Sequence, residues 1–235
     1  MSVDVELLKA FPYFSGLDRA ELESSRGFFF ERKAQRGEFV LKEGEHGETL
    51  YFVASGVVKE FMTSTDGKEQ TLRLIRPGES FNDVPIFDGG PNPASAVAMS
   101  PLVLYGIRKG DMERVMREHP SVALNAIKAL AGRVRYFVSL VEDLSFRHVI
   151  GRVAKILLEQ ARTETGSGPR LTQQEMAAMA GTAREMIGRA LKALEEDGAI
   201  RLDRHRILIT DRDALREMAG VTLETKVTDR QQIEP

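Results

Sequence analysis

The stretch LTQQEMAAMAGTAREMIGRALKALEEDGAI, residues 171–200, predicts two short helices joined by a tight turn. Thr172 and Glu175 have the S/T-x-x-E spacing of a capping box, so the first helix can begin there. Apolar side chains follow, and Gly181 then supplies a residue that tolerates the positive φ of a sharp turn. This order of cap, apolar run and glycine is typical of a helix-turn-helix unit.

The second helix of the stretch has its own capping-box pair, Thr182 with Glu185, and a terminating glycine, Gly198. We therefore expect it to run from about residue 183 to about residue 196. At about 100° per residue, one side gathers the apolar residues Met186, Ile187, Ala190, Leu191 and Leu194. The other side, near the N-terminal end, carries Arg184, Glu185, Gly188 and Arg189.

A buried back and a polar front suit a helix that reads DNA, because the N-terminal part of such a helix enters the major groove. The alternative is an ordinary amphipathic hairpin whose charges are only solvated. Ala177, Gly181 and Ile187 stand at the spacing of close-packed helix-turn-helix units, and this favours DNA reading.

Composition limits the classes of function that need to be considered. The 235 residues suffice for two domains, and the contents of 42% hydrophobic and 29% charged residues are ordinary for a globular protein. The absence of cysteine excludes disulfides, thiolate nucleophiles and cysteine-ligated metals. With a net charge of −2, nucleic-acid binding must rest on a local basic patch, and one is formed by Arg184, Arg189, Lys192, Arg201, Arg204 and Arg206.

Location and catalysis can also be addressed from the sequence. No apolar run approaches the roughly 18 residues of a membrane span, and the N-terminus lacks the basic-then-apolar order of a signal peptide. We therefore expect a cytoplasmic protein without a membrane partner. The four histidines are scattered and form no metal-binding pair, and Gly89-Gly90 lacks the lysine and spacing of a P-loop, so no enzyme is expected.

Residues 27–108 change to the pattern of a β domain, after short helices in residues 3–24. Strand candidates recur at short intervals, with glycines or Asp-Gly steps between them: 39–41, 50–53, 57–61, 71–75 and 102–107. Many short strands at such spacing predict a β-sandwich or barrel.

A long helix is predicted after Pro120, a residue that fits the first turn of a helix. Six apolar residues follow at alternating spacings of three and four, which is a coiled-coil seam: Leu124, Ile127, Ala131, Val134, Val138 and Val141. A second stripe lies beside it and can pack on the chain's own β domain: Ala123, Leu130, Phe137, Leu140 and Leu144. Burial of the whole helix in a monomer is the alternative, but the regular spacing favours a homodimer.

The remaining segments complete the prediction. Residues 145–148 are expected to form a hinge, residues 149–161 an amphipathic helix and residues 163–169 a Gly/Ser/Pro loop. Residues 200–202 and 207–209 predict a small hairpin, followed by a short helix over residues 211–219. The polar tail 221–235 lacks a periodic face, which is typical of disorder.

These segments resemble the cyclic-AMP receptor protein/FNR family of bacterial transcription factors. The resemblance lies in EGEHGETLYFVASGVVK (residues 43–59), FRHVIGRVAKILL (146–158) and the helix-turn-helix stretch, and it covers about residues 5–215. It implies an α+β chain with a cyclic-nucleotide-binding-like β-barrel (jelly roll) in residues 1–119. A dimerisation helix in residues 120–145 and a winged helix-turn-helix domain in residues 146–220 would follow.

The resemblance implies a homodimeric, effector-responsive regulator that binds an inverted repeat of double-stranded DNA with TGTGA-like half-sites, and it favours an activator that contacts RNA polymerase. Residues 163–170 match a region that some relatives use for the polymerase contact, although they equally suit a plain connector. Arg184 and Arg189 are suited to donate hydrogen bonds to guanine O6 and N7, and Glu185 is suited to accept one from cytosine N4. The alternative role of Glu185 is to be the capping-box partner of Thr182. Phosphate contacts are expected from Thr172, Gln173, Thr182, Arg204 and Arg206, with Gly188 on the same face.

The effector segment departs from the family pattern. Cyclic-AMP binders of the family hold the phosphate with a short helix start and an Arg-Ser or Arg-Thr pair. Aligned on Phe87, the glycine and glutamate of that motif become Asn82 and Asp83, and the Arg-Ser pair becomes Pro93 and Ala94. The cationic donor is absent, and Pro93 has no N–H, so tight binding of cyclic AMP or cyclic GMP is not expected.

A small apolar or planar effector is expected instead, and its identity is open. The candidate pocket residues are Phe81, Asn82, Asp83, Pro93, Ala94, Ser95, Arg133, Phe137 and Val138. Haem, which some relatives hold as a gas sensor, is one alternative, although no histidine or cysteine falls at an obvious pocket position. The other is a constitutive DNA-binding dimer in which Asn82, Asp83 and Asn92 cap turns and the pocket is closed.

Overall fold

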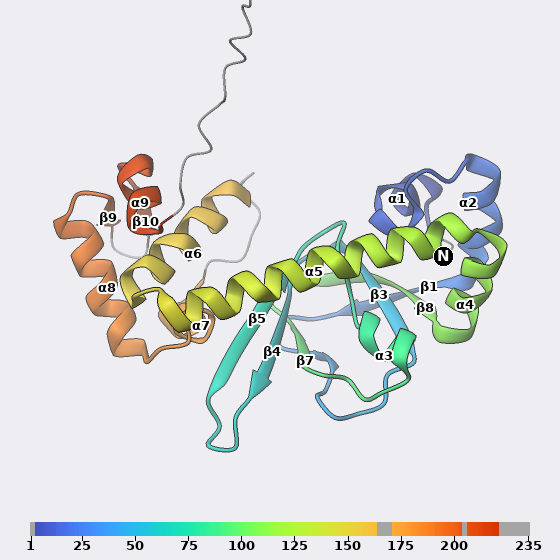
Figure 1. Ribbon diagram of the computed structural model, residues 1–235, viewed down its shortest axis with the longest axis horizontal. Coiled ribbons are helices and arrows are strands. Elements are labelled where there is room, and N and C mark those ends of the chain that lie inside the picture. Colours follow the sequence, from blue (N-terminus) through green and yellow to red (C-terminus); the bar gives the residue numbers. More distant parts are fainter. Residues whose placement is uncertain (1–2, 164–170, 204–205, 221–235) are drawn as a thin grey trace, which may run out of the picture.

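The computed structural model describes residues 3–163, 171–203 and 206–220. Figure 1 shows an N-terminal β domain and a C-terminal helical domain joined by one long helix, α5 (Pro120–Phe146). This is the predicted order of a jelly-roll β domain, a long helix and a winged helix-turn-helix domain.

The β domain consists of two four-stranded antiparallel sheets. One has the order β1-β8-β3-β6 (Phe29–Ala34, Leu102–Arg108, Thr49–Ser55, Ser80–Phe81), and the other has the order β2-β7-β4-β5 (Phe39–Leu41, Ser95–Ala98, Val58–Thr63, Glu69–Ile75). Apolar side chains between the sheets form one core, which includes Val53, Val58, Ile75, Phe81 and Leu104. The five expected strands are present, whereas β1, β6 and β7 were not predicted.

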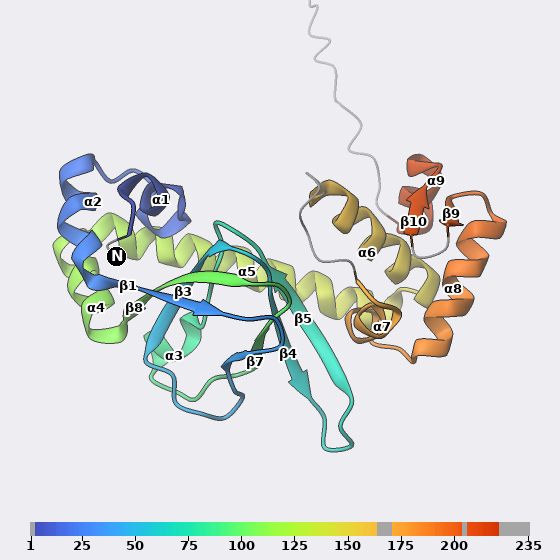
Figure 2. The same ribbon diagram turned by 180° about the vertical axis from the view of Figure 1, so that it is seen from behind.

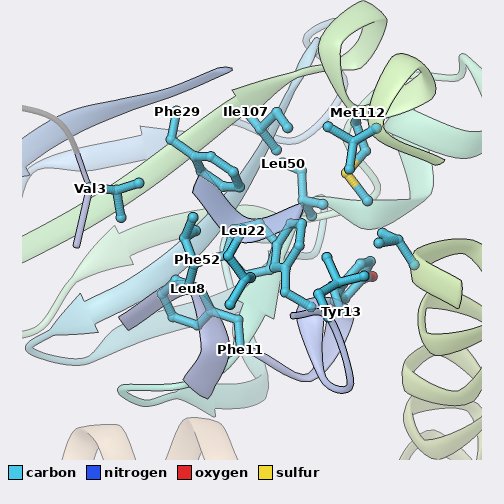
Figure 3. Packing of buried hydrophobic residues seen from close by; sticks show 14 of the residues in the cluster. Val3, Leu8, Phe11, Tyr13, Leu22, Phe29, Leu50, Phe52, Ile107 and Met112 are labelled. Atoms are coloured by element: carbon cyan, nitrogen blue, oxygen red, sulfur yellow. The ribbon is translucent and has the colours of Figure 1, made fainter. Parts of the chain in front are cut away.

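Short helical segments pack on the first sheet and close a second core. They are α1 (Val5–Ala10), η1 (Pro12–Phe14), α2 (Arg19–Ser25), η2 (Arg26–Phe28) and α4 (Lys109–Glu118). Figure 3 shows the aromatic centre of this core, where the rings of Phe11 and Tyr13 lie 4.7 Å and 5.5 Å from the ring of Phe52. Because burial of aromatic rings dominates core energetics, the N-terminal segment is fixed to the sheet.

Helix α5 begins with Pro120 at its first turn, as predicted, and runs past the β domain toward the helical domain (Figure 2). Its fully buried residues are Val122, Ala126 and Asp143. All residues of the second apolar stripe, which was expected to pack on the β domain, are half-buried. Helix α5 also makes polar contacts to the β domain, including the bond from the Tyr136 hydroxyl to the Leu72 carbonyl oxygen at 3.0 Å.

The break between α5 and α6 (Val149–Thr163) is shorter than the predicted hinge. Helix α5 continues through Phe146, so only Arg147 and His148 lie between the two helices. The carboxylate of Asp143 forms ion pairs with Arg147 at 2.8 Å and with Lys155 of α6. These charge-assisted contacts tie the two helices together at the break.

The helical domain contains α6, α7 (Gln173–Ala180), α8 (Arg184–Glu196), the hairpin β9–β10 (Ile200–Asp203, Arg206–Ile209) and α9 (Arg212–Met218). Its core is formed by side chains from each of these helices, among them Val153, Met176, Ile187, Leu194 and Leu215. In both ribbon views α7 lies beside β5, and Gln70 Nε2 of β5 donates to the Met179 carbonyl oxygen at 3.4 Å. In the part of the chain that the structure describes, no helix is long and apolar enough to cross a membrane.

Candidate DNA interface and effector site

The first helix of the predicted reading unit begins as the sequence indicates. The Thr172 N–H donates to Glu175 Oε2 at 2.6 Å, and the Glu175 N–H donates to Thr172 Oγ1 at 3.2 Å, so the first capping box is confirmed. Gly181 ends the helix at φ 59° and ψ 43°. The positive φ is the reason that this turn favours glycine, whereas a Cβ here would only have to displace the ends of the Leu144 and Gln70 side chains.

The second capping box was predicted wrongly. Helix α8 begins one residue later, with Ala183 at the N-cap and no side-chain hydrogen bond to its first turn. The Thr182 N–H instead donates to the Ala177 carbonyl oxygen at 3.1 Å, which closes the turn. Thr182 therefore belongs to the turn, and Glu185 does not serve as its capping partner.

Helix α8 has the two faces that its sequence predicts. The back is buried through Ile187, Ala190, Leu191 and Leu194, and the front exposes Arg184, Glu185 and Arg189. Met186, expected on the back, is 36% exposed and lies beside the front, where the Arg189 guanidinium approaches its sulfur at 3.8 Å. An exposed arginine and glutamate at the start of a helix match the side chains that read guanine and cytosine edges.

Gly188 lies between these side chains in the interior of α8. A Cβ built on this residue has no atom within 4 Å, so packing in the described protein does not require glycine here. A helical glycine costs about 1 kcal/mol relative to alanine. The absence of a side chain at residue 188 therefore affects the exposed face of α8 and not the packing of the core.

The other predicted DNA contacts flank this face. Thr172 and Gln173 are exposed at the start of α7, and Thr182 is half-buried in the turn before α8. Arg206 is exposed at the start of β10, whereas Arg204 lies outside the described residues, as do residues 164–170 of the predicted polymerase loop.

The predicted effector residues fall into two groups. Five are buried in the β domain: Phe81, Asn82, Asp83, Ala94 and Ser95. Asn82 has a positive φ of 66° and its Nδ2 donates to the Thr49 carbonyl oxygen at 2.9 Å. Ser95 Oγ accepts a hydrogen bond from the Glu43 N–H at 3.0 Å, while Pro93 is exposed. These polar side chains are therefore already engaged within the protein.

Arg133 is the predicted residue that α5 brings to the β domain. Its guanidinium forms an ion pair with the buried Asp83, whose carboxylate also accepts hydrogen bonds from the Tyr13 hydroxyl and, at 3.2 Å, from Ser80 Oγ. Burial lowers the pKa of Arg133 to about 10, and the nearby Arg73 cation acts in the same direction. Sequence analysis missed Tyr13, Ser80 and Arg73, because no local pattern connects them.

Phe137 and Val138 were expected to face the pocket, and the structure does not place them there. Val138 is 63% exposed, and Phe137 is half-buried with its ring 5.7 Å from that of Tyr136. Tyr136, together with Arg133, turns toward the β domain instead. Burial raises the pKa of the Tyr136 phenol to about 12.

The predicted coiled-coil seam lies on the exposed side of α5. Five of its residues are each 61% to 63% exposed: Leu124, Ile127, Val134, Val138 and Val141. Ala131, the sixth, is also exposed. A continuous apolar stripe of this kind is uncommon on a monomer.

Comparison with known proteins identifies both domains. Residues 31–119 match the family described as "Cyclic nucleotide-binding domain", and residues 151–218 match the "Crp-like helix-turn-helix domain". A protein named "Cyclic AMP receptor protein" from Thermus thermophilus is 36% identical over 212 residues, which cover 90% of this chain and 98% of the relative. A "CRP-like cAMP-activated global transcriptional regulator" from Mycobacterium tuberculosis is 34% identical over 78% of this chain and 85% of its own length.

Solved structures agree with these relationships. The catabolite activator protein of Thermus thermophilus is 36% identical, with a TM-score of 0.53 over 89% of this chain and 98% of the other. FixK2 from Bradyrhizobium japonicum shares the fold, with a TM-score of 0.71 at 23% identity over 81% of this chain and 96% of the other. From its two domains and these relatives, we conclude that the chain belongs to the cyclic-AMP receptor protein/FNR family of DNA-binding transcriptional regulators.

Proposed function

We propose that this protein is a homodimeric, effector-responsive regulator that binds an inverted repeat of double-stranded DNA. The observation that carries the proposal is the front of α8, where Arg184, Glu185 and Arg189 stand exposed over a buried back. Because Glu185 has no capping role, its carboxylate is available to cytosine N4, and the two arginines are available to guanine. A TGTGA-like half-site suits these three side chains.

The exposed seam of α5 supports assembly into a homodimer. A second copy of α5 would cover the stripe from Leu124 to Val141 and place two α8 helices on one DNA duplex. The half-sites would then lie about one helical turn apart. We propose domain limits of 1–119, 120–145 and 146–220, with residues 221–235 as a tail.

We propose, because the chain belongs to this family, that the protein activates transcription by contacting RNA polymerase. Relatives include regulators whose names describe them as cAMP-activated and global. Residues 163–170 are the proposed polymerase contact, and a cytoplasmic location is proposed together with this role.

The effector is proposed to differ from cyclic AMP, although the names of two relatives refer to that ligand. Pro93 and Ala94 stand where cyclic-AMP binders carry the Arg-Ser pair, and Asp83 is already neutralised by Arg133. The engaged side chains of Asn82 and Ser95 favour, as a second candidate, a dimer whose barrel interior is closed. A haem-based sensor is a weaker alternative, since none of the predicted pocket residues is a histidine or a cysteine, the side chains that most often ligate haem iron.

Selection of binding sites from a random DNA library tests the proposal. The parent protein should select an inverted repeat, and Arg184→Ala should lose about 1–3 kcal/mol of binding free energy and relax one base position in each half-site. Arg117→Ala is the matched control, because Arg117 is exposed on α4, which lies at the opposite end of α5 from α8 (Figure 1). An Arg184→Ala protein that selects the same sequences as the parent would falsify the base-reading assignment.

A further inference from the structure

A cavity of about 520 Å³ lies where the β domain, α5 and the helical domain meet. The β domain contributes Arg73, Leu74 and Ser80 to its lining, and α5 contributes Gly132, Arg133 and Tyr136. Glu159 and Gln160 of α6 and Met179 of α7 form the side that belongs to the helical domain. The volume is within the roughly 300–1,000 Å³ of small-molecule sites, and such sites are common at domain interfaces.

Two arginines, one from β5 and one from α5, bring their guanidinium groups together in the lining of this cavity. Arg73 Nη2 and Arg133 Nη2 both donate to the Ser80 carbonyl oxygen, at 2.8 Å and 3.1 Å, so two guanidinium groups converge on one point. Arg73 also donates its Nε to Glu60 at 2.7 Å. A guanidinium has five N–H donors, so these bonds leave donors that a ligand can use.

Further charges stand at the edge of the cavity. Arg76 is half-buried there, and within the described residues its guanidinium has no ion pair. Two acidic side chains, Glu79 and Glu159, also line the edge. Three arginines and two glutamates line the cavity, and ion pairs with Glu60 and Asp83 hold Arg73 and Arg133 in place. Arg76 is therefore the arginine of the lining that contributes positive charge outside these two pairs.

The walls are mainly apolar. Leu74, Met179 and Ala129 face the cavity together with the ring of Tyr136, whose hydroxyl is held by the Leu72 carbonyl oxygen. An apolar wall and a planar ring favour a flat organic body, and convergent guanidinium groups favour an anionic group on it.

We propose that this cleft between the domains, rather than the barrel interior, is the effector site, and that it takes a planar aromatic anion. The proposal rests on the proposed function, because it names the site and ligand class of an effector-responsive regulator. A ligand bound here touches the β domain and the helical domain at once. Its binding energy therefore depends on how α7 and α6 sit against β5, which couples ligand binding to DNA binding.

The test uses 1-naphthyl phosphate as the probe and the full-length protein. Calorimetric titration should show one site per chain, with tighter binding than for neutral 1-naphthol. Gly132→Leu should weaken binding about tenfold by filling the cavity. A Cβ at this helical position meets no atom within 4 Å, so the variant should fold. Gly110→Leu in α4 is the matched control, since its Cβ position is equally open and lies away from the cavity.

A second pair of variants tests the charge. Arg76→Gln should weaken binding of the phosphate about tenfold and leave binding of 1-naphthol unchanged, as loss of a charged hydrogen bond predicts. Arg117→Gln, at an exposed position of α4, should bind both compounds like the parent. Absence of phosphate binding by the parent, or parent-like binding by both Gly132→Leu and Arg76→Gln, overturns the proposal.

The coupling is measured separately from the site. Saturating 1-naphthyl phosphate should change the dissociation constant for the selected DNA by about fivefold or more in the parent, and not in Gly132→Leu. An unchanged DNA affinity in the presence of bound probe contradicts the effector role of the cleft. The proposed function is tested independently by DNA selection without any probe, so failure of one experiment is distinguishable from failure of the other.

Discussion

Arg133 of α5 is paired with Asp83, the first residue of α3 (Asp83–Asp88), and the Asp83 side chain is completely buried. The Tyr13 hydroxyl donates to the same carboxylate, so one acidic group joins the N-terminal segment, the β domain and the long helix. Burial also raises the pKa of Tyr13, which keeps its hydroxyl protonated as a donor. The contact fixes where α5 crosses the β domain and therefore where the helical domain begins.

Asp83→Asn is expected to destabilise the protein by about 3–5 kcal/mol, because it leaves the Arg133 cation buried without a partner. Urea unfolding measures this loss. The double variant Asp83→Asn/Arg133→Met should recover a large part of it, since both charges are then removed. If the single variant is as stable as the parent, or the double variant is no more stable than the single one, the pair does not have this structural role.

The two threonines of the reading unit should differ in their effect on stability. Thr172→Ala removes the side-chain acceptor of the Glu175 N–H and should cost about 1 kcal/mol. Thr182→Ala should cost much less, because Thr182 Oγ1 caps no helix and its backbone bond to Ala177 remains. Thermal unfolding without DNA compares the two variants, and an equal loss for both would show that Thr182 contributes a cap after all.

These two threonines also show how far sequence reasoning reaches. Capping boxes are a pattern of local spacing, so Thr172 with Glu175 could be predicted and is confirmed. Thr182 with Glu185 has the same spacing, but the αL conformation of Gly181 directs the Thr182 N–H back to Ala177. The Glu185 carboxylate and the Ala177 carbonyl oxygen are alternative acceptors for the Thr182 N–H, and the conformation of the turn selects Ala177. The spacing of Thr182 and Glu185 in the sequence does not reveal this choice.

Long-range contacts mark the other limit of prediction. The exposed seam of α5 and the buried back of α8 follow from helical periodicity and were predicted. The bond from Tyr13 to Asp83 joins residues 70 positions apart, and Arg73 meets Arg133 only because β5 and α5 become neighbours in space. The pocket was therefore expected to be apolar at Phe137 and Val138, whereas the structure places charged groups on the neighbouring face of α5.

Val134→Asp/Val138→Asp is expected to split the proposed dimer, because it puts two charges on each copy into the apolar seam. Sedimentation equilibrium should show a folded monomer with greatly weakened affinity for an inverted repeat. Phe39→Asp/Met62→Asp is the matched control, since both side chains are exposed, at 46% and 42%, on strands away from α5. A parent protein that is monomeric under conditions where it binds DNA would exclude the dimer.

Gly188→Ala should affect folding and DNA binding in opposite directions. The new methyl group enters open space in the described protein and replaces a glycine in a helix interior, so stability should rise by up to about 1 kcal/mol. On the proposed DNA face the same methyl occupies space that the nucleic acid would approach, between Arg184 and Arg189. We expect the affinity for the selected DNA site to fall about tenfold, because an added methyl group in a close interface costs about as much as slight overpacking of a core.

Gly110→Ala is the control for this trade-off, because its Cβ position is also open and it lies in α4. That variant should leave DNA affinity unchanged. Urea unfolding and fluorescence anisotropy with labelled DNA give the two readouts on the same preparations. If Gly188→Ala gains stability and binds DNA as tightly as the parent, then the DNA backbone and bases do not approach α8 at this residue. The reading face would then have to be moved away from the first two turns of the helix.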